Sequence, residues 1–413
     1  MRPGSSLAPA TAALMLTLLL SLQPVTTDLM LTALPALAAD LHAPMAPVQL
    51  TLSATILAFG IAQLFWGPVA DRLGRRPVML LGLSGYTLAC VGAWTAADVA
   101  TLVLWRAAQG ATMAAAVVCA RAMVRDLYEP HEGAGVMAKA LTGLGVVAIL
   151  CPLLGGVLVN AFGWRAAIVA MGLCAVALTA IIALRLPETI RQRNRNATRI
   201  APLLRQSGAI LGNPSFRAWT LLVACTYGGL YTTLASAGIV MIQVLQLSTT
   251  AAGLVLSLMG CSYIAGTLLC RHWLPRHGLV GTVARAAWFS LTAGALLAVV
   301  AITDTRSVWL LMASLCVFSA GHGTHQPCGQ TGAVSAFPHA AGLASALAGF
   351  VLALVAFGVG LWLGHALDGS VRPLATGVAV GASLSALVAW TLVRHHGEPL
   401  PPLRPQAAKP VAG

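Results

Sequence analysis

Long apolar runs dominate this chain, and they constrain its fold more than any other feature. Twelve of them have a length of roughly 20 residues, which crosses a hydrocarbon core of ~30 Å as a helix. The runs show no strand-like alternation and are too long for barrel strands, so helices are the way to satisfy their backbone in lipid. They lie at residues 11–36, 48–70, 77–95, 101–123, 135–159, 165–185, 217–240, 251–271, 280–301, 307–331, 341–366 and 373–393.

The composition supports this interpretation. Charged residues make up 8% of the chain and hydrophobic residues 58%, whereas soluble domains carry about 25% charged residues. The 41 glycines and 22 prolines suit a packed helix bundle in lipid. A cleaved secretory signal is disfavoured, because the first apolar run is too long and Asp28 interrupts it. The sequence therefore predicts an all-α membrane protein with twelve transmembrane helices.

The net charge of +13 is distributed asymmetrically between the connections. With the N-terminus in the cytoplasm, twenty Lys and Arg residues fall on the inner side, against Arg165, Arg306 and Arg372 on the outer side. This is the positive-inside asymmetry of a multi-pass protein of the bacterial inner (plasma) membrane with both termini cytoplasmic. The excess of positive charge therefore reflects the orientation of the chain in a lipid bilayer and does not indicate a nucleic-acid partner.

A polar, basic connection divides the chain into two six-span halves. We expect an N-terminal six-helix bundle at 1–186, a cytoplasmic linker at 187–216, a C-terminal six-helix bundle at 217–395 and a disordered tail at 396–413. Within the linker, the stretch "LLRQSGAIL" is compatible with an amphipathic helix on the inner leaflet and equally with a solvated segment. Six plus six spans is the arrangement of transporters built from two repeats around a midplane site.

A short repeat supports this division. "GPVADR" (67–72) follows the second span, and "GTLLCR" (266–271) follows the eighth, with Gly and Arg at matching offsets. Cys270 takes the place of Asp71 in the second copy.

Several motifs together resemble the major facilitator superfamily, and within it the Bcr/CflA-type drug:proton antiporters, including chloramphenicol and florfenicol exporters. They are "GPVADRLGRRPVML" after the second span, "RAAQG" (106–110), "ARAMVRDLYEP", "CPLLGG" (151–156), "GWRAAI", "LPETI" and "AGLASALAGF" (341–350). The resemblance implies the major facilitator fold of two six-helix bundles and the export of drug-like molecules in exchange for protons. The chain departs from the pattern at "TDLMLT", where Met30 and Thr32 replace Tyr and Pro, and at Cys151, which replaces a glycine. These departures concern the substrate range.

One acid and one base lie well inside the predicted spans. Burying a carboxylate in a membrane helix costs ~2.5–3.5 kcal/mol on insertion scales, so Asp28 is a functional candidate. We expect it to carry protons or contact substrate; the alternative is a permanently paired acid that orients the first helix. The resemblance links Arg106 to proton coupling, and we expect it to pair with Asp28 or with a residue nearby. The alternative is an arginine that snorkels to the outer interface.

The charged stretch after the second span is predicted to be a conformational latch. Its arginines hold the loop in the cytoplasm, and its glycines permit a tight turn. By resemblance, Asp71 lies at the start of the eleventh helix, around 340–344, and Arg75 meets Asp126. The alternative is a topology anchor without a role in transport. The latch residues are Gly67, Asp71, Arg72, Gly74, Arg75, Arg76 and Asp126.

Two further groups are candidates for the transport path. Pro152, Gly155 and Gly156 match the antiporter motif, which implies a kinked fifth helix that seals the bundle against proton leak. A cavity for lipophilic molecules requires aromatic walls with a few polar groups; helix packing is the alternative for the tyrosines and a satisfied core histidine for His325. The cavity candidates are Gln23, Thr27, Met30, Tyr227, Tyr231, His325 and Gln326.

Enzyme chemistry finds no support in the sequence. There is no Walker lysine motif, no glycine-rich turn after a strand, and no metal-ligand spacing among the nine cysteines. We therefore predict a protein without enzymatic activity, cofactor or metal, acting as a monomer and driven by an ion gradient or by the gradient of its substrate. The leading hypothesis is a secondary active efflux transporter that exchanges protons for drug-like small molecules by alternating access, with amphenicol-type antibiotics as candidate substrates. The alternative is a proton-coupled symporter or metabolite exporter of the same fold.

Overall fold

The computed structural model describes residues 9–128, 130–190, 193–194, 197–337 and 340–398. All regular secondary structure in these residues is helical. The elements are α1 (Pro9–Asp28), α2 (Leu34–Asp40), α3 (Met45–Leu73), α4 (Arg75–Trp94), α5 (Val99–Leu127), α6 (Pro130–Phe162), α7 (Arg165–Arg185), α8 (Ile200–Gly212), α9 (Pro214–Ile239), η1 (Val240–Val244), α10 (Thr249–Thr303), α11 (Val308–Ser335), α12 (Ala341–Ala366), α13 (Arg372–Val388), η3 (Ala389–Val393) and α14 (Arg394–His396).

Ten helices of the described chain are long and apolar enough to cross a membrane. One of them, α10, runs over 55 residues with a non-helical backbone at Gly278, where φ is +63°. A straight helix of that length would measure about 80 Å, far more than the ~30 Å hydrocarbon core. The 28-residue α11 is not among the ten; its sequence contains His322, His325 and Gln326. The count of twelve crossings therefore stays a prediction.

The first predicted span is not one continuous helix. Helix α1 ends at Asp28, a turn occupies residues 29–33, and α2 begins at Leu34. Pro35 stands in the first turn of α2, where its missing N–H is tolerated and its fixed φ favours helix initiation. A continuous helix over 11–36 is therefore corrected to two helices, with Asp28 at the break between them.

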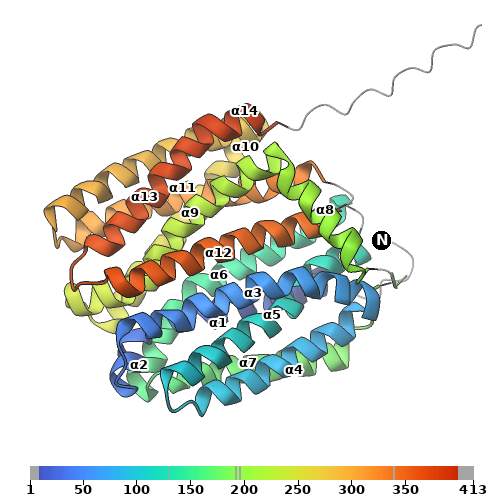
Figure 1. Cartoon of the computed structure of the whole chain (residues 1–413), viewed down its shortest axis with the longest axis horizontal. Helices are drawn as coiled ribbons and strands as arrows, with labels where there is room; N and C mark the ends of the chain where they lie inside the picture. Colours follow the sequence, from blue (N-terminus) through green and yellow to red (C-terminus); the bar gives the residue numbers. More distant parts are fainter. Residues whose placement is uncertain (1–8, 129, 191–192, 195–196, 338–339, 399–413) are drawn as a thin grey trace, which may run out of the picture.

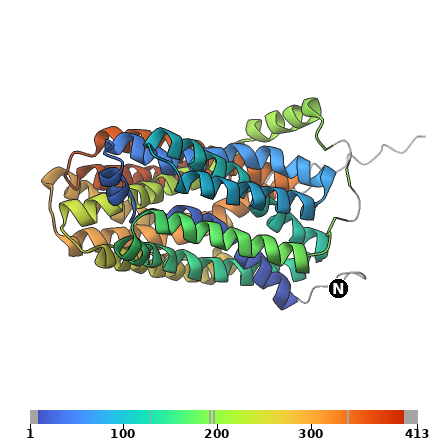
Figure 2. The same cartoon turned by 90° about the horizontal axis from the view of Figure 1, so that it is seen from below.

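The hydrophobic core follows the division of the sequence. One large buried cluster draws on residues 12–186, and three others draw on residues 210–393. In Figures 1 and 2 the long helices run roughly side by side, and Figure 1 places α2 at one end of the bundle and α8 at the other.

Small residues bring the two halves into contact along α6 with α10 and along α3 with α12. Ser257 of α10 donates to the carbonyl of Ile149 in α6 at 2.9 Å. A Cβ added at Gly364 of α12 would lie 3.0 Å from Ala46 Cα at the start of α3. Such close approach is what small residues permit in membrane bundles.

The linker contains a helix at the stretch that the sequence analysis considered compatible with an amphipathic helix. The stretch 203–211 lies within α8, which packs against α12 and α9 and stands clear of the bundle in Figure 2. Its location on a leaflet stays a prediction. The predicted disordered tail lies outside the described residues from 399 onward.

Candidate transport site

Asp28 lies at the C-terminal end of α1, where the helix breaks. Its Oδ1 accepts a hydrogen bond of 2.7 Å from the Thr27 hydroxyl. Protein atoms lie as densely around the carboxylate as around a buried group, yet the residue is only half-buried, as expected of a group that lines an internal space. Gln23 and Thr27 are half-buried as well. The candidates Gln23, Thr27 and Asp28 therefore share a partly accessible stretch at the end of α1.

Partners from other helices surround this acid. The Asp28 carboxylate is near enough to act electrostatically on the Tyr227 hydroxyl of α9 and on the Cys151 thiol of α6. Tyr227 is half-buried, whereas Tyr231, one turn further on, is buried beside Ser53 and Gly360. Residues from both halves of the chain thus meet at the end of α1.

Arg106 is held inside the N-terminal half and does not snorkel. The residue has no exposed surface. Its Nη2 donates to the Thr26 carbonyl at 2.8 Å, and its Nη1 donates to Gln109 Oε1 at 2.6 Å. The Thr26 hydroxyl shares a 2.6 Å hydrogen bond with the Tyr86 hydroxyl. Arg106 therefore binds the backbone of α1 two residues before Asp28, rather than forming the direct ion pair with Asp28 that was one of the expectations.

The antiporter-motif residues pack on the break in α1. Pro152, Gly155 and Gly156 of α6 are buried. A Cβ added at Gly155 would lie 2.5 Å from the Leu29 carbonyl oxygen and 3.0 Å from Leu29 Cα. Gly155 therefore permits a contact that any side chain would obstruct. From the other half, a Cβ at Gly238 of α9 would lie 2.6 Å from the Leu31 carbonyl oxygen.

Three cavity candidates are buried, contrary to the expectation of the sequence analysis: Tyr231, Met30 and His325. Met30 lies within the turn after α1 and has no exposed surface. His325 is also fully buried, and its Nε2 lies 3.1 Å from the Ser290 hydroxyl of α10. None of the three lines accessible space in this structure, and His325 is the core histidine that was its alternative. Gln326 beside it is half-buried, and its Oε1 has no partner among the described residues.

The predicted latch is a network between the end of α3, the start of α4, the end of α5 and the linker. Arg75 Nε donates to Asp126 Oδ2 at 3.0 Å, the contact that the sequence analysis expected. Arg75 Nη2 pairs with Asp71 Oδ1 at 2.6 Å. Within the described residues, Arg75 is thus the ion-pair partner of Asp71; the predicted place of Asp71 at the start of α12 stays a prediction. Gly74 takes a φ of +110°, which its lack of a side chain permits.

The predicted inner loop is corrected to a junction of two helices. Gly67, Asp71 and Arg72 lie inside α3, Arg75 and Arg76 lie inside α4, and Gly74 alone separates the two helices. A Cβ added at Gly67 would be 3.9 Å from Val118 of α5.

The remaining two arginines bind the linker and α7. Arg72 Nη1 donates to the Thr198 hydroxyl at 2.9 Å, and Arg76 Nη2 donates to the Ala183 carbonyl at 2.7 Å.

Glu188 is a member of this network that the sequence analysis did not assign. Its Oε1 accepts the backbone N–H groups of Arg75, Thr189 and Ile190 at 2.9 to 3.1 Å. A carboxylate at the first residue of α4 satisfies an otherwise unpaired N–H and complements the helix dipole. Glu188 belongs to the "LPETI" motif, which marked this stretch in the sequence. The motif alone did not indicate that the carboxylate would cap the start of α4.

A second cluster, at the opposite end of the N-terminal half, was also missed. Asp40 Oδ2 accepts hydrogen bonds from Trp164 Nε1 at 3.0 Å and from Arg165 Nη1 at 2.6 Å. These bonds hold the pKa of the Asp40 carboxyl below its ordinary value. Arg165 also donates to the carbonyls of Trp94 and Ala96. The "GWRAAI" motif therefore joins the end of α2, the start of α7 and the connection after α4.

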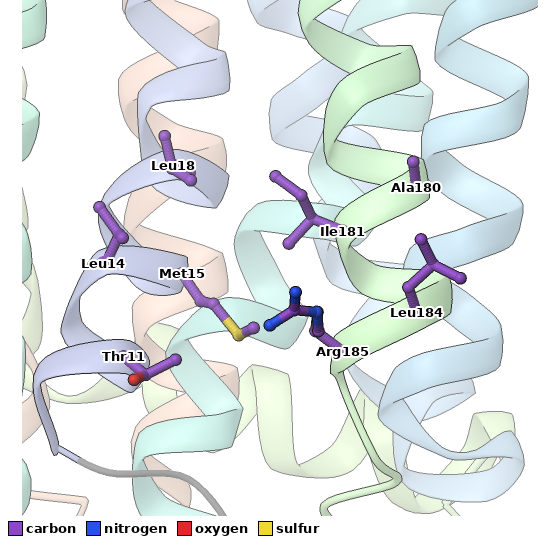
Figure 3. A pocket seen from close by; sticks show the side chains of 8 residues that line it. All are labelled: Thr11, Leu14, Met15, Leu18, Ala180, Ile181, Leu184 and Arg185. Carbon is purple, nitrogen blue, oxygen red and sulfur yellow. The ribbon is translucent and has the colours of Figure 1, made fainter.

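A pocket between α1 and α7 lies apart from these residues. It holds about 360 Å³ and is lined mainly by apolar side chains of Thr11 to Leu18 and Ala180 to Arg185; Figure 3 shows the Arg185 guanidinium beside Met15. Leu18 precedes Asp28 by ten residues, about 15 Å along a helix. This pocket is not the site around Asp28.

The geometry describes a multi-pass helical membrane protein whose two halves meet at a broken first helix carrying a carboxylate, and this is the architecture of a secondary transporter. The chain belongs to the Major Facilitator Superfamily, which matches residues 16–361. Several of its relatives are named for multidrug resistance.

Two relatives and one solved structure illustrate the similarity. Multidrug resistance protein D of Escherichia coli (strain K12) is 29% identical over 390 residues, covering 94% of this chain and 98% of the relative. A chloramphenicol resistance protein of Pseudomonas aeruginosa is 29% identical over 304 residues, covering 73% and 71%. The crystal structure of a D-xylose-proton symporter superposes with a TM-score of 0.75 at 16% identity, covering 94% of this chain and 99% of that one. The structural similarity establishes the fold alone.

Proposed function

We propose that this protein is a secondary active exporter that exchanges external protons for internal drug-like small molecules, with amphenicol-type antibiotics as candidate substrates. The observation that carries the proposal is Asp28, a carboxylate at a helix break that faces an internal space. The other acidic residues of the described chain lie near helix ends that face the connections, or in the connections themselves. The names of relatives that act in multidrug and chloramphenicol resistance support drug-like substrates.

The surroundings of Asp28 suit a proton carrier. The carboxylate stands at the C-terminal end of α1, where the negative end of the helix dipole disfavours a second negative charge. Its hydrogen-bond partner is the Thr27 hydroxyl. A hydroxyl can donate to the ionised carboxylate and can accept from the protonated acid, so it suits both states. Arg106 anchors the adjacent backbone without neutralising the acid. The proton-coupling pair is thus proposed to work through Thr26: protonation of Asp28 changes the end of α1, and Arg106 is the fixed point against which it moves.

Alternating access requires contacts that hold one side closed and then break. Between the halves, Gln49 of α3 donates to the Ala235 carbonyl of α9 at 2.7 Å, and Gly238 packs on the turn after Asp28. We propose that these contacts close the outer side, and that the network around Arg75 steadies the inner loops. Twelve crossings follow if α10 crosses twice and α11 once, which places both termini in the cytoplasm of a bacterial cell. The unit of transport is one chain.

The test uses inverted membrane vesicles from an efflux-deficient host that expresses the chain. Respiration first acidifies the lumen, and chloramphenicol is then added outside. Antiport predicts alkalinisation of the lumen, because protons leave as drug enters. Acidification on addition of a substrate would instead indicate symport. No pH change and no added resistance across a panel of lipophilic antibiotics would reject drug export.

A further inference from the structure

Arg121 is a cation in the inner part of the N-terminal half that the transport scheme has not used. It lies on α5, five residues before Asp126, which places it about 7.5 Å further into the membrane than the Arg75–Asp126 pair. Its neighbours in sequence, Ala120 and Ala122, are buried, whereas Arg121 is exposed. Protein atoms nevertheless lie as densely around it as around a buried group. This combination indicates a side chain in an internal space that water reaches.

The helical register shows which way Arg121 faces. At 100° per residue, it is rotated by about 20° from Gly110, which packs on the Thr55 carbonyl of α3. By the same rule it is about 60° from Arg106, which binds α1. The exposed Trp105 lies about 160° away, on nearly the opposite face. Arg121 therefore projects between α1 and α3 and away from the surface that carries Trp105.

No counter-charge accompanies this cation. Within the described residues, the Arg121 guanidinium has no hydrogen-bond or ion-pair partner, and no carboxylate is near enough to act on it. Arg106 and Arg75 differ from Arg121 in this respect, because Arg106 binds Gln109 and Thr26, and Arg75 binds two carboxylates. An uncompensated guanidinium with five donors is a binding group for planar anions.

We propose that Arg121 gives the inner vestibule, the water-accessible space between α1, α3 and α5, a preference for anions. It would make the transporter favour substrates that carry a carboxylate or another electron-rich planar group over substrates that carry a cation. This inference rests on the proposed export function, because the vestibule is the face from which an exporter loads. The positive charge of Arg121 lies in a wall of low dielectric constant, so its electric field attracts anions and repels cations that enter the vestibule.

The first test measures the field without any substrate. A cysteine at Val118, one turn before Arg121 and half-buried, is modified in inverted vesicles by two small thiosulfonate reagents, one anionic and one cationic. Peptide mass spectrometry at position 118 separates this site from the nine native cysteines. We expect Arg121→Gln to lower the anionic-to-cationic rate ratio at least about fivefold, and Arg271→Gln, an exposed cation of α10, to leave it unchanged. An unchanged ratio in Arg121→Gln, or no reaction with either reagent, would overturn the inference.

The second test concerns substrate class. Chloramphenicol and its hemisuccinate ester share a scaffold and differ by one negative charge, and tryptophan fluorescence of the purified protein reports their binding. Arg121→Gln should weaken the ester about tenfold and chloramphenicol by less than about twofold, while Arg121→Lys should keep most of the preference. Equal losses for both ligands would contradict a charge-selective role. If wild type binds neither ligand, amphenicol export fails, and the rate ratio at position 118 alone decides the inference.

Discussion

The two halves of this protein bury polar groups in different ways. In the N-terminal half, a fully buried arginine, Arg106, binds the backbone beside Asp28. Among the described residues of the C-terminal half, the buried polar side chains are hydroxyls and imidazoles: His322 Nδ1 lies 3.0 Å from the Thr226 hydroxyl, and His325 Nε2 lies 3.1 Å from the Ser290 hydroxyl. A buried neutral hydrogen bond fixes two helices together, whereas a buried charge responds when a nearby charge changes. Under the proposed function, we therefore infer that proton transfer depends on the N-terminal half, whereas the C-terminal half contributes neutral packing contacts.

The inner ends of the two halves repeat this contrast. At the junction of α3 and α4, Arg75 pairs with Asp71 and with Asp126 of α5. At the matching offset in α10, the Cys270 thiol lies 3.4 Å from the Cys328 thiol of α11. One half therefore uses ion pairs where the other uses a weak contact between neutral groups.

The largest expected effect tests whether proton coupling depends on the N-terminal half alone. Asp28→Asn removes the titrating group and keeps its size, so uphill drug export in energised inverted vesicles should fall roughly hundredfold or more. His325→Asn should retain at least half of the wild-type rate, because that ring is a neutral packing group. Asp98→Asn, at the N-cap of α5, is the matched control for loss of one carboxylate. Uphill export by the Asp28 variant would contradict the contrast between the halves.

The next prediction concerns the contact between the antiporter motif and the helix break. Gly155→Ala places a Cβ 2.5 Å from the Leu29 carbonyl oxygen, and overpacking of this kind costs about 1–3 kcal/mol. We expect transport to fall at least about tenfold, with a lower thermal stability in detergent. Gly145→Ala on the same helix is the control, since an added Cβ there meets no atom within 4 Å. Equal behaviour of the two variants would show that the contact has no consequence.

A double-mutant cycle sharpens the comparison of the inner ends. Arg75 and Asp126 have side chains that are 7% and 19% exposed, so their coupling energy should be about 1–3 kcal/mol. The pair of Cys270 and Cys328, replaced singly and together by Ala, should couple by less than about 0.5 kcal/mol, because thiols are weak hydrogen-bond groups. Unfolding of the purified protein measures both cycles. Similar coupling in the two halves would remove the distinction.

The smallest effect is expected at the outer cluster of the N-terminal half. The pKa of Asp40 is lowered by its bonds to Trp164 and Arg165, so the folded protein favours the ionised carboxyl. The stabilisation is present above about pH 4, the ordinary range of Asp, and is lost as pH falls through the lower folded pKa. Arg165→Gln should therefore lower the melting temperature slightly at pH 7 and less at about pH 3. A difference that grows on acidification would contradict this assignment.

The sequence was sufficient for the features that follow from local composition. Runs of apolar residues, the charge asymmetry and the basic linker predicted a helical membrane protein, because a backbone in lipid has few ways to satisfy its hydrogen bonds. The motifs indicated the family that the comparison then established. The contact of Arg75 with Asp126 was expected by resemblance and is present.

Tertiary structure decided what the side chains do. The sequence placed Asp28 and Arg106 in two spans, but only the packing of α1 against α5 determined that the guanidinium binds the Thr26 carbonyl and leaves the carboxylate to a hydroxyl. Likewise, the pattern "GHGTHQPCGQ" left His325 open to either role, and its burial against Ser290 made it a core residue. Hydrophobicity sets which segments enter the membrane, because it acts on each segment alone. The partner of a buried polar group depends on which helices lie beside it, and one helix does not carry that information.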